Sequence, residues 1–68
     1  MTLEVIQMFK ELFELSQQQG KGLMFYIKGQ CVNGSVTTII GDELVEVQNQ
    51  EYDRILIRVA AIDAVAMS

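Results

Sequence analysis

The segment Ile-Arg-Val-Ala-Ala-Ile at residues 57–62 gives the clearest indication of the fold. Every second residue from 55 to 59 is a β-branched aliphatic, which predicts a strand over residues 54–59 with these side chains on one face. The two alanines that follow permit a tight corner, and residues 62–67 predict a short final strand. The end of the chain is therefore expected to hold two consecutive strands joined at a narrow turn.

The preceding part of the chain shows the same period of two, interrupted by turn residues. Residues 23–28 alternate as one strand and residues 30–40 predict a longer one. Gly34 lies inside the longer strand, where the missing side chain allows a sharp bend or a close backbone approach. Gly41-Asp42 is a turn signal, and residues 44–48 predict a third strand. One face of the first strand holds Leu23, Phe25 and Ile27, and one side of the second holds Val32, Val36 and Ile40.

Residues 2–19 have the spacing of an amphipathic helix. Thr2 is the expected N-cap, Glu4 lies in the first turn, and Gly20 can adopt the left-handed conformation that ends a helix. One helix face is expected to carry the apolar side chains of Val5, Met8, Phe9, Leu12 and Leu15. Further apolar residues widen this stripe beyond what one small sheet needs, and we expect the excess to contact a neighbouring subunit: Leu3, Ile6 and Phe13.

This order predicts a mainly β fold with an N-terminal α-helix and a strongly bent five-stranded β-barrel. The whole chain, residues 1–68, is expected to be a single domain, with the helix at 2–19 and the barrel at 23–67. SH3-like, OB-like and Sm-like barrels all match this outline, and the pattern alone does not choose among them.

Two segments resemble the Sm-like family. Residues 31–36, Cys-Val-Asn-Gly-Ser-Val, resemble its second strand, where Gly, a small residue and an aliphatic follow one another. Residues 57–62, continued by Val65, resemble the second Sm motif, which typically reads Ile-Arg-Gly, two variable residues, Ile and a later aliphatic. The resemblance covers almost the whole chain, from about Leu3 to Met67, although Val59 replaces the Gly of the motif. It implies an Sm-like, SH3-related barrel.

The resemblance also implies a ring in which the fourth strand of one subunit pairs with the fifth strand of the next. Such head-to-tail pairing closes into a cyclic homo-oligomer, here of about five to seven subunits. No proline blocks either of the two terminal strands. The residues expected at the subunit interface are Ile55, Ile57, Val59, Ile62, Ala64 and Val65.

In the Sm-like family, single-stranded RNA binds near the pore of the ring. Arg58 matches the motif Arg that stacks on a base, and Asp42 lies in the loop where the family has an Asp that orders the pocket. The family's base-reading Asn has no counterpart, because Leu44 or Val45 stands at the expected place. Two further RNA contacts are considered from the residues themselves. Tyr26 is a stacking platform or a packing residue, and Lys28 is a phosphate contact or a surface cation.

Composition argues against several other classes of protein. The chain has no His and one cysteine, so neither a disulfide nor a tetrahedral metal site is expected, and Cys31 is expected to be a small buried hydrophobe. Without a nucleophile–base pair or a phosphate-binding glycine loop, we expect no enzymatic activity and no cofactor. The longest apolar runs are far shorter than a membrane span, and no signal peptide is expected.

The sequence therefore predicts a cytoplasmic Sm-like ring protein that binds short single-stranded RNA, with Arg58, Asp42, Tyr26 and Lys28 as its site. The alternative is a ring-forming structural or protein-interaction scaffold without RNA binding. The net charge of −4 and the missing Asn favour that alternative, because an acidic chain is not drawn to phosphates. A monomeric SH3-like module is a third reading, which would leave apolar strand edges exposed.

Overall fold

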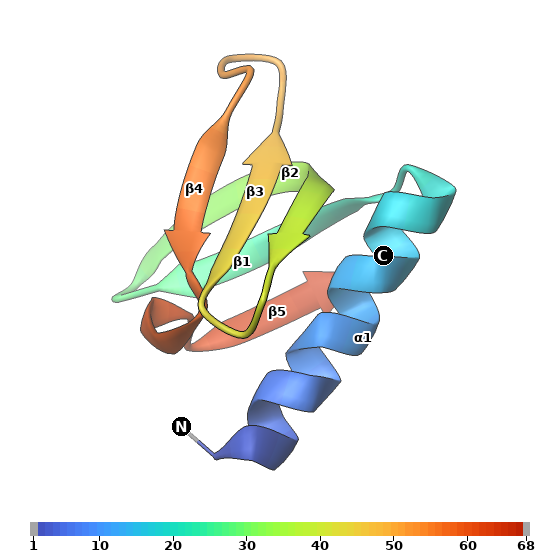
Figure 1. The fold of residues 1–68 in the computed structure, drawn as a ribbon. Helices are drawn as coiled ribbons and strands as arrows, with labels where there is room; N and C mark the ends of the chain where they lie inside the picture. The colour runs from blue at the N-terminus through green and yellow to red at the C-terminus, as the bar shows by residue number, and fades with distance from the viewer. Residues whose placement is uncertain (1, 68) are drawn as a thin grey trace.

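A computed structural model describes residues 2–67 and shows one helix followed by five strands (Figure 1). The elements in chain order are α1 (Leu3–Gln19), β1 (Gly22–Ile27), β2 (Gln30–Ile40), β3 (Leu44–Gln48), β4 (Ile55–Arg58), the 3-10 turn η1 (Val59–Ala61) and β5 (Ala64–Met67). The strands form one antiparallel sheet in the order β4-β3-β2-β1-β5. This confirms the mainly β class with an N-terminal helix, and the bent but unclosed sheet is consistent with an Sm-like fold.

The long strand β2 bends the sheet because its two halves pair with different neighbouring strands. Its first part pairs with β1 and its second part pairs with β3, and the two ladders meet at Ser35. Gly34 is buried beside this point, where an added Cβ would lie 2.8 Å from the Gln48 carbonyl oxygen and 3.2 Å from Val47 Cγ2. The predicted close backbone approach at Gly34 is confirmed, and it lets the strand cross its neighbour as the sheet curves.

A β-bulge between Val36 and Thr38 corrects the predicted face of the second strand. Val36 is buried as expected, but the extra residue reverses the alternation that follows. Ile39 therefore packs against the core, and Ile40 is exposed. The prediction that Ile40 shares a side with Val36 was wrong for this reason.

The helix begins and ends as its sequence predicts. Thr2 Oγ1 accepts a hydrogen bond from the Val5 N–H, and Gly20 adopts a left-handed conformation with φ of 69°. The face that packs on the sheet differs from the predicted one. Phe13 and Ser16 are fully buried, with Ile6, Phe9 and Leu12 packed against the core. Three residues predicted for the packed face, Val5, Met8 and Leu15, are exposed, as is Leu3.

The core lies between α1 and the concave face of the bent sheet (Figure 1). Phe13 stands at its centre, with its ring centroid 5.8 Å from that of Phe25 on β1 and 6.4 Å from that of Phe9. The other fully or nearly buried apolar side chains come from β1 to β4, from η1 and from the residue that follows it: Leu23, Val36, Val45, Val47, Ile57, Val59 and Ile62.

Two polar residues near the end of α1 bind backbone groups of β2 beside the bulge, beyond the end of the ladder with β1. Ser16 Oγ accepts a hydrogen bond from the Val36 N–H at 3.0 Å and donates one to the Lys21 carbonyl. Gln17 Nε2 donates to the Thr37 carbonyl at 2.8 Å. The helix is thus fixed to the bulge by hydrogen bonds as well as by apolar packing.

Replacing Ser16 by alanine should therefore lower the free energy of unfolding by about 1–3 kcal/mol, because the Val36 N–H stays buried without a partner. Gln17→Ala serves as the control, since its hydrogen bond is exposed and its loss should cost no more than about 1 kcal/mol. Urea denaturation followed by circular dichroism measures both. Equal effects of the two substitutions would contradict the role given to Ser16.

Candidate nucleic-acid interface

Three connections lie together at one end of the sheet: the β1–β2 turn, the β2–β3 turn and η1 (Figure 1). We call this region the loop end. Lys28 and Gly29 form the two-residue β1–β2 turn with φ of 51° and 79°, as a type I′ turn requires. Asp63 connects this turn to the segment after η1. Its N–H donates to the Tyr26 carbonyl at 2.8 Å, and its Oδ2 accepts from the Lys28 N–H at 2.9 Å.

Arg58 is the last residue of β4 and lies across from Leu44 at the start of β3. The next residue, Val59, donates its N–H to the Glu43 carbonyl at 2.8 Å. These backbone contacts hold Arg58 beside the β2–β3 turn, and its side chain is exposed. The structure therefore brings the predicted Arg and the predicted Asp loop into adjacent positions.

The carboxylate of Asp42, in contrast, is engaged with the helix. Lys10 Nζ lies 2.9 Å from Asp42 Oδ1, and this contact is both a hydrogen bond and an ion pair. Among residues 2–67, Asp42 forms no ion pair with Arg58. Asp42 thus fixes the β2–β3 turn to α1 rather than orienting Arg58 directly.

Tyr26 lies on the outer face of β1, on the side away from the core. Its neighbours across the sheet are Cys31 on β2 and the small residue Ala64 on β5, so the ring stays 41% exposed. The packing alternative for Tyr26 is excluded by this exposure. An exposed tyrosine two residues from Lys28 offers a π-face for a base next to a cation for a phosphate.

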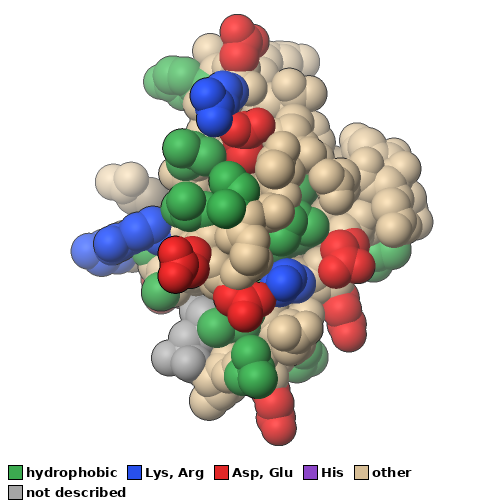
Figure 2. Space-filling view, in the orientation of Figure 1, with side chains coloured by type: hydrophobic (Ala, Val, Ile, Leu, Met, Phe, Trp, Pro, Cys, Tyr) green, Lys and Arg blue, Asp and Glu red, His purple; other side chains and the backbone are tan. Residues whose placement is uncertain are grey.

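The two basic side chains of the loop end, Lys28 and Arg58, form no ion pair with any acid in residues 2–67. Two of the neighbouring acids are already engaged, Asp42 by Lys10 and Asp63 by the Lys28 N–H. Figure 2 shows basic side chains over the end of β4 and the β1–β2 turn, at the left of the view, with acidic side chains next to them. Lys28 and Arg58 are therefore free to contact an anion, although the nearby Glu43 and the net charge of −4 oppose its approach.

The position at which the family has its base-reading Asn holds no hydrogen-bonding side chain in this chain. Val45 is fully buried in the core, and Leu44 is a half-buried aliphatic opposite Arg58. Hydrogen-bond readout of a base edge from these two positions is therefore excluded. Any recognition at the loop end rests on stacking and charge, which tolerate different bases.

The residues predicted for the subunit interface divide into two groups. Ile57, Val59 and Ile62 are buried in the chain's own core, and Ile55 and Val65 are partly buried against it. Of the predicted set, only Ala64 is exposed, and Leu56 on β4 adds an apolar side chain that is 53% exposed. A neighbour that pairs with these edges would therefore meet mainly backbone groups and a few small or isolated apolar side chains.

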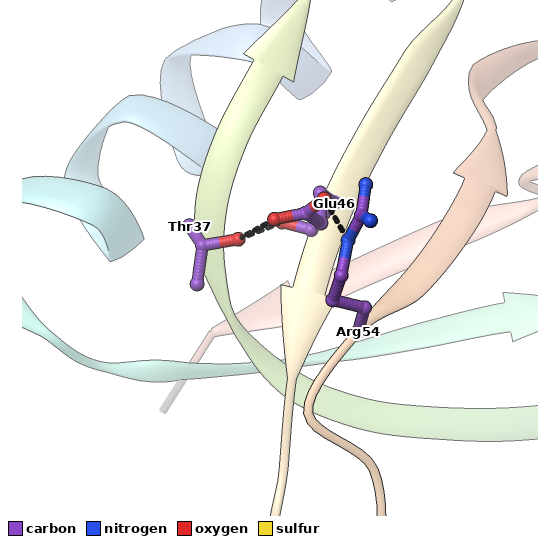
Figure 3. Close-up of polar contacts among 3 residues, drawn as sticks. All are labelled: Thr37, Glu46 and Arg54. Carbon is purple, nitrogen blue, oxygen red and sulfur yellow. Dashed lines mark hydrogen bonds and ion pairs between the residues drawn. The ribbon is translucent and has the colours of Figure 1, made fainter.

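A cluster of Thr37, Glu46 and Arg54 lies on the outer face of the sheet (Figure 3). Glu46 alternates with the buried Val45 and Val47, so its side chain points away from the core. Its Oε2 accepts a hydrogen bond from Thr37 Oγ1 at 2.8 Å, and its Oε1 accepts one from Arg54 Nε at 2.8 Å. The hydrogen bond from Thr37, and then that from Arg54, lower the pKa of Glu46 below its ordinary value.

Because of this cluster, the free energy of unfolding is expected to decrease as the pH is lowered. A lowered folded-state pKa means that Glu46 stabilises the fold above its ordinary pKa, and the contribution disappears as the pH falls through the folded pKa. We expect an NMR titration of the Glu46 carboxyl carbon to show its midpoint below that of an unstructured peptide. Thr37→Val should raise that midpoint. An unchanged midpoint in Thr37→Val would contradict the assignment of the hydroxyl as the main cause.

Sequence reasoning missed or misjudged three residues near these features. Asp63 was not among the predicted site residues, although it connects the β1–β2 turn to the segment after η1 through backbone groups. Cys31 is exposed rather than buried, because it lies on the outer face of β2 opposite Tyr26. Glu46 lies in the strand predicted over residues 44–48, but its hydrogen bonds to Thr37 and Arg54 were not predicted.

No protein-family model, no curated protein and no solved structure matches this chain. Within residues 2–67, no group of three or more His, Cys, Asp or Glu side chains is placed to hold a metal ion. No helix in the same range has the length and hydrophobicity needed to cross a membrane.

Proposed function

We propose that the chain is a subunit of an Sm-like ring that binds short single-stranded RNA at the loop end. The observation that carries this proposal is the pair of cations, Lys28 and Arg58, which lack ion-pair partners within residues 2–67, while two neighbouring acids, Asp42 and Asp63, bind Lys10 and the Lys28 N–H. Lys28 and Arg58 contact phosphates, and the exposed ring of Tyr26 stacks on a base. The proposal places no base-specific hydrogen bond on β3.

Ring formation supports this function because it repeats a weak site around one axis. Each chain contributes one Tyr26, one Lys28 and one Arg58, and a strand that contacts several subunits gains affinity through effective concentration. The free edges of the sheet, β4 and β5, are the elements that would pair between subunits. The sheet order places them at opposite ends of one sheet, as head-to-tail pairing requires.

Fluorescence polarisation with labelled oligo(U) and oligo(A) at two salt concentrations tests RNA binding. We expect both oligonucleotides to bind, since stacking and phosphate contacts do not select a base. Tyr26→Ala should cost about 1–3 kcal/mol of binding free energy for each stacked base. Arg58→Ala should make the slope of log affinity against log salt less negative by about 0.7 for each phosphate that the arginine neutralises.

Arg54→Ala is the matched control for Arg58→Ala. It removes a guanidinium of the same chain that is bound to Glu46 and lies outside the loop end. RNA affinity that falls equally in the two variants would show that only overall charge matters. An unchanged affinity in Arg58→Ala would overturn the proposed site.

A scaffold without RNA binding is the second candidate, and one observation favours it. Asp42 lies in the loop where the family has an Asp that orders its RNA pocket, and here its carboxylate is bound to Lys10 on the helix. The same polarisation assay decides between the two. A ring that shows no binding to either oligonucleotide at low salt would support the scaffold.

A further inference from the structure

A shallow hollow lies where the bent sheet fails to close, between the first half of β2 and the start of β4. We call it the seam hollow, and it is lined by Cys31, Val32, Asn33, Tyr52, Arg54 and Ile55. The β3–β4 connection borders it, on the side of the sheet away from the loop end (Figure 1). The seam hollow meets the proposed RNA site only at Cys31, which lies opposite Tyr26, and its other lining residues lie toward the β3–β4 connection.

The backbone of β2 turns an unpaired edge toward the seam hollow. The two-residue turn makes Ile27 and Gln30 a hydrogen-bonded pair, and backbone directions alternate along the strand from there. The even-numbered residues of β2 up to the bulge therefore direct their N–H and C=O groups toward β1. Cys31 and Asn33 direct theirs to the opposite side, toward the seam hollow.

Two hydrogen bonds confirm this alternation. The Asn33 carbonyl accepts a hydrogen bond from Asn49 Nδ2 at 2.8 Å, on the β3 side of the strand. The Val36 N–H points to the β1 side beyond the end of that strand, where Ser16 Oγ accepts it. Pairing with β3 begins only at Ser35, opposite Gln48. Within residues 2–67, the Cys31 N–H and carbonyl and the Asn33 N–H consequently have no hydrogen-bond partner.

The side chains around this edge favour an uncharged, partly apolar occupant. Val32 and Ile55 are half-buried and supply an apolar floor, and the Tyr52 ring is 59% exposed beside them. Arg54 is held by Glu46 through Nε, and Glu51 also borders the seam hollow. A single guanidinium among these acids gives no net positive charge, so a phosphate backbone has little to gain there.

We propose that the seam hollow binds an extended peptide segment of a partner protein, which adds a short strand beside Cys31–Asn33. Alternating donors and acceptors on an unpaired strand edge are what an extended peptide backbone complements. An aliphatic side chain of the peptide packs on Val32 and Ile55 and against the Tyr52 ring. This function is additional to RNA binding and does not require it.

The test uses the full chain and a capped hexapeptide that alternates threonine and valine. Titration is followed by the backbone amide signals of the ¹⁵N-labelled protein. We expect the Cys31 and Asn33 amide signals to move with saturation in the high-micromolar to millimolar range. Tyr52→Ala should weaken binding about tenfold, since it removes the exposed aromatic anchor.

Two controls make the result specific. Arg58→Ala removes an exposed cation at the end of β4 away from the seam hollow, so it should weaken RNA binding but leave peptide affinity unchanged. A peptide of the same sequence with N-methylated valines has fewer backbone donors and should bind at least tenfold more weakly. Because Tyr52→Ala and Arg58→Ala each affect one ligand, failure of the peptide site and failure of the RNA site are distinguishable.

Three results would overturn the proposal. The first is the absence of any movement of the Cys31 and Asn33 amide signals up to millimolar peptide. The second is equal binding of the N-methylated peptide, which would show apolar adsorption without strand addition. The third is movement of the same two amide signals by oligo(U) and not by the peptide, which would make the seam hollow a nucleic-acid groove.

Discussion

Replacing Phe13 by alanine is expected to lower the free energy of unfolding by about 3–5 kcal/mol. The Phe13 side chain is fully buried, and its ring packs against Phe9 on the same helix and Phe25 on β1. Its removal leaves a cavity at the one place where helix and sheet share a core. Domains have a stability of about 5–15 kcal/mol, and a chain this short lies near the lower limit, so the loss removes most of the total.

Met8→Ala is the matched control on the same helix. Met8 is 65% exposed, and methionine and alanine both favour helix, so we expect a change within about 0.5 kcal/mol. Guanidinium denaturation of the two variants, followed by circular dichroism, measures the difference. A larger loss for Met8→Ala than for Phe13→Ala would show that the helix packs on the sheet by its other face.

The helix shows what hydrophobic spacing can and cannot determine. Its bounds followed from local chemistry, because Thr2 and Gly20 provide the cap at each end. The face of the helix that packs on the sheet could not be predicted, because apolar residues cover more than half of the helix circumference. Two adjacent apolar stripes fit the same helical period. The buried Ser16 decides between them, yet a serine inside a helix gives no signal in the sequence that it faces a bulge 20 residues away.

The strands were predictable where alternation was uninterrupted. Residues 23–27 occupy the predicted faces and residues 44–48 form the predicted strand, because each is a simple run with one buried side. The bulge near Thr37 is a property of the pairing of β2 with β3, so no pattern within β2 alone could reveal that Ile39 replaces Ile40 at the core. The predicted corner at Ala60-Ala61 became the turn η1, Val59–Ala61, because small residues tolerate that tight winding.

The sequence predicts which functional side chains lie at the loop end, but it does not predict which of them bind one another. Arg58, Asp42, Lys28 and Tyr26 lie on the connections at that end or on the strand leading into them. Which acid binds which cation depends on where α1 lies across the sheet, and Lys10 reaches Asp42 only because of that placement. The seam hollow depends on the failure of the sheet to close, which is a property of the whole fold.

The second large effect concerns assembly, and it depends on which backbone groups of β4 are free. The Val59 N–H donates to the Glu43 carbonyl, which makes these two residues a hydrogen-bonded pair. Because such pairs alternate with non-hydrogen-bonded ones, Ile57 and Ile55 direct their backbone groups to β3. Leu56 directs its N–H and carbonyl outward, to the free edge that a neighbouring β5 would use.

Leu56→Pro is therefore expected to convert a ring into monomers that remain folded. Proline removes the outward N–H without breaking a bond to β3, and edge strands tolerate proline at such positions. Leu56→Ala keeps the N–H and removes the exposed side chain, so it should still assemble if backbone pairing holds the subunits together. Native mass spectrometry gives the number of chains, and circular dichroism checks that each variant is folded.

The pattern of the three results separates backbone pairing from apolar contact. Assembly in the natural chain and in Leu56→Ala, with folded monomers in Leu56→Pro, is the outcome that edge pairing requires. Monomers in Leu56→Ala as well would instead assign the interface to the exposed leucine side chain. A ring of unchanged size in Leu56→Pro would place the contact elsewhere, and a natural chain that is already monomeric would remove the ring from the proposed function. RNA binding at the loop end would then have to act through one chain, without the gain in affinity that repeated Arg58 and Tyr26 side chains give around an axis.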